Sequence, residues 1–373
     1  MRRTWVATAT ILLCLALAGP PGTAQSPATS EPAPVGVFTP VGSLAEPRVF
    51  HTATLLADGR VLVVGGYGQD VGQGSAEVWD PATGTFSRTG SLVQPPQSGH
   101  NAAALPDGRA LVVAMVDWPR NSAEVWDPAT GMFSATGPLA EARLSNPTTT
   151  LLADGRVLVV GDARRDALPS AEVWDPATGT FAPTGSPRIA SCQHSATLMR
   201  DGRVLVVGGT SKGWTTAEVW DPASGNFAPA GTIIASGGCH HDTAMQLPDG
   251  RVLIMSPATA QVWDPATGTL GPELTLPETH DGGSTTLLPD GRLLIVGGGN
   301  EGNEKVSTSL VWDPVTGLSK PGGALAAPRS NHTATLLRDG RVLIVGGYGQ
   351  IGEGPSAQDD QVASAEVWEM ADR

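Results

Sequence analysis

The sequence predicts an all-β protein in which seven copies of one four-stranded unit are arranged in a ring. An Asp-Gly-Arg tripeptide recurs seven times from residue 58 onward, and each copy is followed by a Trp. Successive Trp residues lie about 47 residues apart, a period typical of propeller arrays. Gly (47 residues) and Pro (31) are abundant and aromatic residues make up only 5%, which favours short strands joined by tight turns. We therefore expect a seven-bladed β-propeller of four-stranded antiparallel blades.

The first 24 residues have the pattern of a secretory signal peptide. Arg2 and Arg3 precede an apolar stretch from Ala9 to Ala18, and small residues follow it. The apolar stretch is too short to span a bilayer. We expect residues 1–24 to be the signal peptide, residues 25–34 a disordered linker rich in Ser, Thr, Pro and Ala, and residues 35–373 the propeller. The protein is therefore expected to be secreted and extracellular.

The net charge argues against two classes of partner. Removal of the signal peptide removes two arginines and takes the formal net charge from −13 to −15. Nucleic acids and anionic membranes are bound by clustered Lys and Arg residues that displace counterions. We therefore expect no nucleic-acid partner and no membrane span, and we expect a monomer.

Each copy begins with a hairpin marked by Asp-Gly. In the first copy, residues 51–56 and 61–64 are apolar runs on either side of Asp58-Gly59. Asp-Gly between two such runs favours a type I′ turn, because both central residues need a positive φ. We name the two runs strand a and strand b. Strand b consists of Val, Leu and Ile in most copies, as expected for a strand buried on both faces.

A second hairpin follows a loop of variable length. Ala76–Trp79 is expected to form strand c, and strand d begins at Thr85. Between them lies Asp-Pro-Ala-Thr-Gly, in which the Asp accepts hydrogen bonds from turn amides and the Pro pre-sets φ at the next position. Each copy is thus a four-stranded meander that cannot bury both of its faces alone, and a radial arrangement of the copies solves that problem.

The number of d strands predicts how the ring closes. Residues 36–44 match residues 84–92, which belong to a d strand, whereas the last copy ends at Trp368 with no d strand after it. We therefore expect Val37–Leu44 to complete the blade that begins at His332. Such closure removes the exposed edges that an open array of sheets would leave.

The chain resembles the Kelch repeats of galactose-oxidase-like propellers of a secreted bacterial type. The features that carry the resemblance are the Gly-Gly doublets after strand b, the period and the downstream aromatic pair, and it covers residues 35–373. The family usually has Tyr and then Trp where this chain has Trp79 and then Phe86. Three copies lack the doublet and have other pairs in its place, namely Ala114-Met115, Gly161-Asp162 and Met255-Ser256.

The resemblance implies that strand a lies innermost, beside the ring axis. The position eight residues before the turn Gly is His in four copies, and other His residues are close in sequence. The candidates for an axial cluster are His51, His100, His194, His240, His241, Asp242, His280 and His332. Such a cluster can bind a metal or take up protons together. Alternatively, each His caps its own blade by bonding a neighbouring backbone group, and the sequence does not decide whether a metal is bound.

The b-to-c loops are the candidate ligand-binding face. They vary between copies, whereas the two kinds of turn on the opposite face repeat almost unchanged, and function usually lies in varied loops on a rigid scaffold. The aromatic candidates in these loops are Tyr67, Trp118, Trp214 and Tyr348. Exposed Tyr and Trp side chains stack on sugar rings or anchor a peptide. The alternative is that they pack between neighbouring loops.

Two cysteines of the mature chain form a candidate disulfide. Cys192 and Cys239 both lie a few residues before strand a in consecutive copies, and exported proteins commonly oxidise such pairs. A bond between them requires inner strands that bring the two Cα atoms within about 7 Å.

We expect a binding module for a glycan or protein ligand rather than an enzyme, and we expect no cofactor. Copper radical oxidases on the resembled propeller need a Cys cross-linked to a Tyr, a second Tyr and two His. Here both Tyr residues are flanked by Gly and are distant from any Cys in sequence. No Ser-His-Asp, paired-carboxylate or phosphate-loop motif stands out. The alternatives are an enzyme on this propeller and a structural or adhesive protein of the cell envelope.

Overall fold

The computed structural model describes residues 33–371 apart from a set of short stretches. Those stretches are 69–73, 97, 118–119, 140–144, 163–168, 189–191, 210–214, 234–242, 257, 277–279, 300–303 and 352–357. In the described part every regular element is a β-strand, which confirms the predicted all-β class. No helix in this part is long and apolar enough to cross a membrane.

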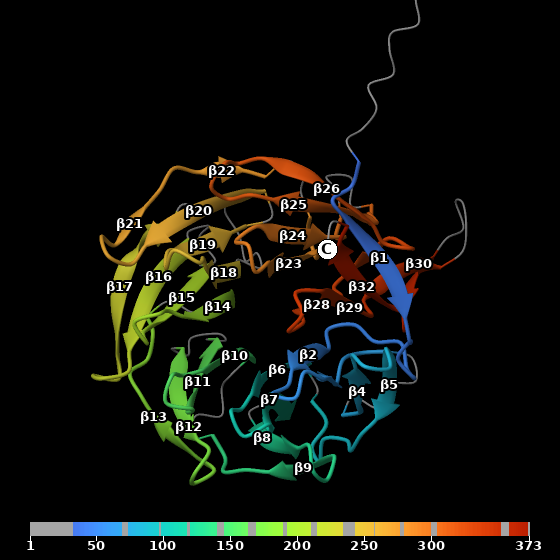
Figure 1. Cartoon of the computed structure of the whole chain (residues 1–373). Coiled ribbons are helices and arrows are strands. Elements are labelled where there is room, and N and C mark those ends of the chain that lie inside the picture. The colour runs from blue at the N-terminus through green and yellow to red at the C-terminus, as the bar shows by residue number, and fades with distance from the viewer. Residues whose placement is uncertain are drawn as a thin grey trace, which may run out of the picture. The chain divides into compact units, whose positions relative to one another are not determined.

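Seven sheets with a four-stranded antiparallel order follow one another in a ring within the described residues (Figure 1). The innermost strands are β2 (Thr52–Leu55), β6 (Ser98–Ala104), β10 (Ser145–Leu151), β14 (Cys192–Leu198), β18 (Thr243–Gln246), β23 (Ser284–Leu287) and β28 (Thr333–Leu336). The second strands are β3 (Val61–Val64), β7 (Ala110–Asp117), β11 (Val157–Asp162), β15 (Val204–Gly209), β19 (Val252–Met255), β24 (Leu293–Val296) and β29 (Val342–Val345). These two sets correspond to strands a and b of the sequence.

The outer half of each sheet corresponds to strands c and d. The third strands are β4 (Ala76–Asp80), β8 (Arg120–Asp127), β12 (Ser170–Asp175), β16 (Thr215–Asp221), β20 (Thr259–Asp264), β25 (Thr308–Trp312) and β32 (Ala365–Met370). The outermost strands are β5 (Thr85–Arg88), β9 (Met132–Ala135), β13 (Thr180–Pro183), β17 (Asn226–Ile233), β21 (Thr269–Leu270), β26 (Ser319–Ala324) and β1 (Gly36–Val41). A short strand β22 (Leu274–Thr275) also pairs with β20.

The N-terminal strand closes the ring. β1 pairs antiparallel with β32, with Phe38 opposite Trp368, and the sheet order is β1-β32-β29-β28. The first described strand of the chain thus supplies the outermost strand of the last sheet, as the count of d strands predicts. Phe38 and Trp368 are both buried in the core cluster between this sheet and the preceding one.

The hydrophobic core lies between neighbouring sheets. All residues of β3, β19, β24 and β29 are buried, because each second strand has another sheet on both of its faces. The repeated Trp of strand c fills the space toward the preceding blade, and Trp126, for example, packs with Leu62 and Val64. Its indole Nε1 donates a hydrogen bond to Thr89 Oγ1 at 3.1 Å in that preceding blade. Five of the seven repeated Trp residues donate such a bond to the preceding blade, whereas Nε1 of Trp79 and of Trp312 has no hydrogen-bond partner among the described residues.

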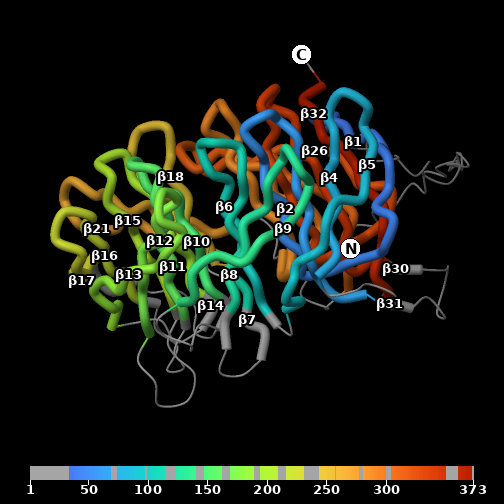
Figure 2. Tube along the Cα trace, turned by 90° about the horizontal axis from the view of Figure 1, so that it is seen from below, coloured from blue at the N-terminus to red at the C-terminus, as the bar shows by residue number. Residues whose placement is uncertain are grey.

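The two kinds of turn lie on one face of the ring. Figure 2 shows the hairpin turns along the upper edge, where β32 also ends. In the Asp-Gly-Arg turns each Arg bonds the Asp of its own turn, as Arg156 does with Asp154 at 2.7 Å. These side chains are exposed, so each pair contributes at most about 1 kcal/mol. The Arg residues therefore bond chiefly within their own turns, and Arg292 in addition contacts Met370 Sδ of the next blade at 3.2 Å.

The Gly-Gly doublets are required where a loop crosses close to strand b. Gly346 has a φ of 61°, and a Cβ built on it would lie 2.6 Å from the Arg48 carbonyl oxygen. A Cβ built on Gly297 would likewise lie 2.5 Å from the Arg329 carbonyl oxygen. In two blades without a doublet, β7 and β11 simply continue through the corresponding residues. The doublet does not by itself set the length of strand b, because β15 also runs through its doublet, Gly208-Gly209, and β19 ends at Met255 although its blade lacks one.

Blade 7 carries an additional small sheet beside these doublets. β27 (Arg329–Ser330) pairs with β30 (Tyr348–Ile351), which in turn pairs with β31 (Gln358–Gln361). In this sheet Tyr348 lies opposite Ser330. The sheet therefore sets the position of one of the two Tyr residues of the chain.

Candidate functional site

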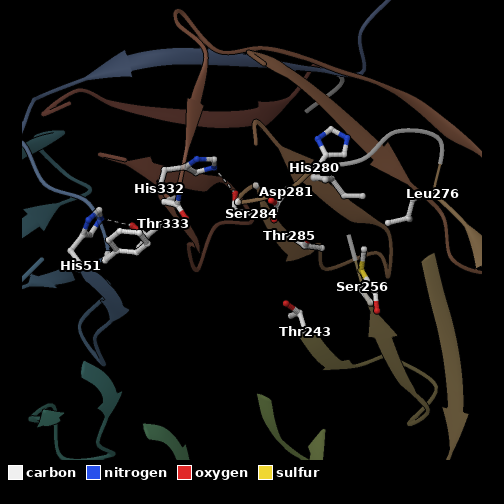
Figure 3. Close-up of a pocket in the computed structure, with 16 residues that line it drawn as sticks. His51, Thr243, Ser256, Leu276, His280, Asp281, Ser284, Thr285, His332 and Thr333 are labelled. Atoms are coloured by element: carbon white, nitrogen blue, oxygen red, sulfur yellow. Dashed lines mark hydrogen bonds between the residues drawn. The ribbon is translucent and has the colours of Figure 1, made fainter. Parts of the chain in front are cut away.

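A pocket of about 360 Å³ opens at the ring axis, where the innermost strands begin. Its walls come from the starts of β18, β23 and β28 and from the segment just before β2 (Figure 3). The innermost strands begin opposite the Asp-Gly turns, so the pocket lies on the face of the b-to-c loops. Its polar lining is rich in hydroxyl groups, which belong to Thr243, Ser256, Ser284, Thr285 and Thr333. Four of these residues lie in strands and Ser256 directly follows β19, so the sheets hold the hydroxyl groups in place.

The axial histidines link each blade to the one before it. His51 Nε2 is 2.9 Å from Thr333 Oγ1, and His332 Nε2 is 2.7 Å from Ser284 Oγ, as the dashed lines of Figure 3 show. His100 Nε2 donates to the carbonyl of Val64 at 2.8 Å, and His194 Nε2 donates to the carbonyl of Val160 at 3.0 Å. All four partners lie in the preceding blade, whereas the sequence suggested bonds within the blade of each His.

His280 differs from these four, because its Nδ1 donates to the Gly297 carbonyl of its own blade at 2.8 Å. It is buried next to the exposed Asp281 at the pocket. His280 therefore caps its own blade, as one of the two interpretations from sequence expects.

Burial keeps the blade-linking imidazoles neutral. Desolvation lowers the pKa of His51 to about 3, and the nearby Arg48 charge lowers it further in the same direction. Desolvation also lowers the pKa of His332 to about 3, with a contribution from the Arg329 charge. The pKa values of His100 and His194 are lowered by burial as well. At neutral pH these groups act as hydrogen-bonding side chains without charge.

Two buried ion pairs hold the loops that carry the axial residues. Arg48 is fully buried and its Nη2 lies 2.9 Å from Glu77 Oε1, while Arg329 Nη2 lies 2.9 Å from Glu366 Oε1. Arg48 Nη1 also donates to the carbonyl of Gly65 at 2.9 Å. Since both charges of each pair are buried, removal of one partner would leave an uncompensated charge. The Arg residues fix the path of the chain into β2 and β28.

Phe50 has an unusual conformation at the rim of the pocket. Its φ is 55° and its side chain is 52% exposed, although both neighbours, Val49 and His51, are buried. Val49 exchanges two backbone hydrogen bonds with Tyr67, so the chain must turn outward between two anchored residues. Three of the corresponding positions in other blades, Gly99, Gly282 and Asn331, also have positive φ. A bulky residue in this conformation is a genuine outlier and often marks a functional position.

Three aromatic rings gather at this point. The Phe50 and Tyr67 ring centroids are 6.3 Å apart with an interplanar angle of 81°, and those of Phe50 and Tyr348 are 6.0 Å apart at 80°. Both Tyr residues of the chain thus flank the one exposed Phe at the pocket. We call Phe50, Tyr67 and Tyr348 the aromatic cluster. Sequence reasoning selected the two Tyr but missed Phe50. The available signal was a Phe before the axial position, where the other copies have Gly, Asn, Gln or His.

Several sequence candidates lie outside the described residues. Among them are Trp118, Trp214, His240, His241, Asp242 and Cys239. The backbone of Cys192 begins β14, but its side chain is also outside the description. The predicted disulfide between Cys192 and Cys239 therefore stays a prediction, which mass spectrometry of the unreduced protein would test.

Comparison with known proteins finds a similar fold among solved structures but no similar sequence family. No family model matches the chain, and no curated protein matches it. Among solved structures, a fungal alcohol oxidase of the AA5 family, in complex with copper, superposes with a TM-score of 0.69. The two sequences are 18% identical, and the match covers 90% of this chain and 76% of the oxidase. The chain thus has a galactose-oxidase-like propeller fold, and at this identity the likeness concerns the fold alone.

The described residues do not form a copper site. Among them, no three His, Cys, Asp or Glu side chains are grouped in a way that could hold a metal ion. His100 and His194 use Nε2 to donate to carbonyls, so these nitrogens have no lone pair for a metal. Both Tyr residues of the chain lie against Phe50. The donor set visible at the axis therefore does not fit the metal that the fold neighbour holds.

Proposed function

We propose that this protein is exported and binds a carbohydrate on the face of the b-to-c loops, over the axial pocket. The observation that carries the proposal is Phe50, which is half-exposed at the rim and held in a left-handed conformation between two Tyr rings. Aromatic rings present a large apolar surface of fixed orientation and contribute much of the energy at binding sites. The hydroxyl-lined pocket beside the ring supplies partners for sugar hydroxyl groups.

The conformation of Phe50 supports a role in binding. A non-Gly residue in a left-handed conformation costs about 1–3 kcal/mol, while each edge contact with a Tyr contributes about 0.5–1.5 kcal/mol. The two contacts therefore offset the strain and hold the ring in one orientation. A ring held in this way loses little conformational entropy when a ligand binds. The aromatic cluster is thus organised before the ligand arrives.

A glycan fits this site better than a protein. Stable protein interfaces are extended surfaces that bury about 800 Å² on each partner. Here the exposed Phe50 ring instead lines a pocket of about 360 Å³. That volume is within the range of small-ligand sites, about 300–1,000 Å³. A single sugar unit of a longer chain can therefore enter the pocket while its apolar face lies on Phe50.

Catalysis by the Ser284–His332 pair is not supported, although the two side chains are 2.7 Å apart in the pocket. The same kind of contact recurs one blade further on, between Thr333 and His51, which indicates a structural link. A general base works best when its pKa is near the operating pH, and the pKa of His332 is about 3. The imidazole would therefore be a weak base at neutral pH.

The test is a glycan-binding screen of the mature protein, followed by isothermal titration calorimetry with the best oligosaccharide. Phe50→Ala is expected to weaken binding by tenfold or more, since truncated anchors typically cost about 2 kcal/mol. The matched control is Val315→Ala, because Val315 is 78% exposed in a turn of the opposite face. Equal affinities of wild type and Phe50→Ala, or loss of binding in the control, would contradict the proposed site.

A further inference from the structure

The charges around the pocket point to one kind of sugar. Asp281 is the only acidic residue among the described residues that line it, and no described Lys or Arg lines it. The two guanidinium groups closest to the axial histidines are each paired with a buried Glu. His51 and His332 are uncharged at neutral pH because burial lowers their pKa to about 3. Among the described lining residues, Asp281 therefore supplies the single carboxylate, and no Lys or Arg accompanies it.

The backbone around Asp281 holds this carboxylate at the pocket. Asp281 exchanges two backbone hydrogen bonds with Gly299, at 2.7 and 3.2 Å. It follows the buried His280, and Gly282 after it has a φ of 68°. The residue is exposed, and no hydrogen bond or ion pair of its side chain is found with the described residues. Asp281 and Ser284 both line the pocket (Figure 3), so a ligand that fills it can meet the carboxylate and the hydroxyl group.

The aromatic cluster itself is not the place for a cation. Lys305 Nζ lies 5.9 Å from the centroid of the Tyr348 ring, so an ammonium group of the protein already lies over one of the three rings. An ammonium group of a ligand is therefore expected at Asp281 and not on these rings. The formal net charge of the chain, −13, also favours cationic over anionic ligands at long range.

We infer that the pocket selects a hexosamine whose amino group is free and protonated, with the ammonium group at Asp281, the apolar sugar face on Phe50 and the hydroxyl groups on the Ser and Thr side chains. The inference rests on the proposed function, because it specifies which carbohydrate that same site takes. Acidic sugars such as uronic acids are disfavoured, since they would bring a second negative charge next to Asp281. A Lys side chain would supply the ammonium group but none of the hydroxyl groups.

The experiment is calorimetry of the mature protein with three matched β-1,4-linked tetrasaccharides, built from glucosamine, N-acetylglucosamine and glucose. N-acetylation removes the positive charge and keeps the sugar ring, and the glucose oligomer lacks the nitrogen. We expect the glucosamine oligomer to bind about fivefold more tightly than the other two, which corresponds to about 1 kcal/mol for a partly exposed ion pair. Added salt should reduce only this advantage.

Asp281→Asn should remove the advantage of the glucosamine oligomer and leave the affinity for the glucose oligomer unchanged. The control is Glu369→Gln, because Glu369 is an exposed residue of β32 and its replacement changes the net charge by the same amount. The inference is overturned if all three oligomers bind equally, or if Asp281→Asn weakens all three alike. If none of them binds, or if Phe50→Ala leaves every affinity unchanged, the proposed function fails as well. Binding through Phe50 with no preference for the amine refutes the inference alone.

Discussion

Replacement of Phe50 by Gly should give a more stable protein than replacement by Ala, which reverses the usual order of these two residues. The left-handed conformation costs an L-residue about 1–2 kcal/mol, and the φ of 55° at Phe50 means that Ala would carry this strain while Gly would not. Gly in turn gives the unfolded chain more conformational freedom, which costs about 0.5–1 kcal/mol. Both variants lose the same ring contacts. The Gly variant is therefore expected to be more stable by about 0.5–1 kcal/mol.

The measurement is the midpoint of urea unfolding for the two variants under identical conditions, with the slope of the transition compared as a check. The control pair is Ser87→Gly and Ser87→Ala, because Ser87 is exposed in the regular strand β5, where Gly should be the less stable residue. If Gly is also less stable than Ala at position 50, by the amount seen at position 87, the left-handed conformation is wrong. Both Phe50 variants should lose carbohydrate binding to the same extent, because binding depends on the ring and not on the strain.

Three further predictions concern the ring itself. His332 has a pKa of about 3 in the folded protein and about 6.5 in the unfolded chain, so below pH 6.5 the unfolded state binds more protons. The free energy of unfolding should therefore fall as the pH drops, by up to about 1.4 kcal/mol per pH unit for each such imidazole. Urea midpoints between pH 6.5 and 4.5 should show a smaller slope for His332→Gln, and an unchanged slope would contradict the buried, neutral state. Arg48→Met leaves a buried Glu unpaired and should lower the free energy of unfolding by about 3–5 kcal/mol. The control, Arg60→Met, breaks an exposed pair and should lower it by less than about 1 kcal/mol in the same assay. Deletion of residues 25–41 removes the strand β1 that pairs with β32, so it should lower the midpoint of thermal unfolding and promote aggregation through the exposed edge of β32. A deletion variant with the same thermal midpoint as the full mature chain would argue against this closure.

The sequence by itself determined the repeating architecture, because the signals involved are local. Asp-Gly at each first turn and Asp-Pro-Ala-Thr-Gly at each second turn specify hairpins through the φ values that these residues allow. The apolar second strands predict burial on both faces, and β3 and β29 are buried throughout. Even the closure by β1 could be predicted, because it follows from counting strands in a ring that must not leave an open edge.

Only the tertiary structure decided which residues meet at the axis. Arg48 and Glu77 are 29 residues apart, and His51 and Thr333 are 282 residues apart, so neither contact leaves a local pattern in the sequence. The role of Phe50 depends on a left-handed conformation that arises because Val49 and His51 are both anchored. Asp281 becomes a candidate only when the pocket places it near the aromatic ring and the hydroxyl groups. The repeats specify each blade through local interactions, whereas the site depends on side chains of different blades that closure of the ring brings together.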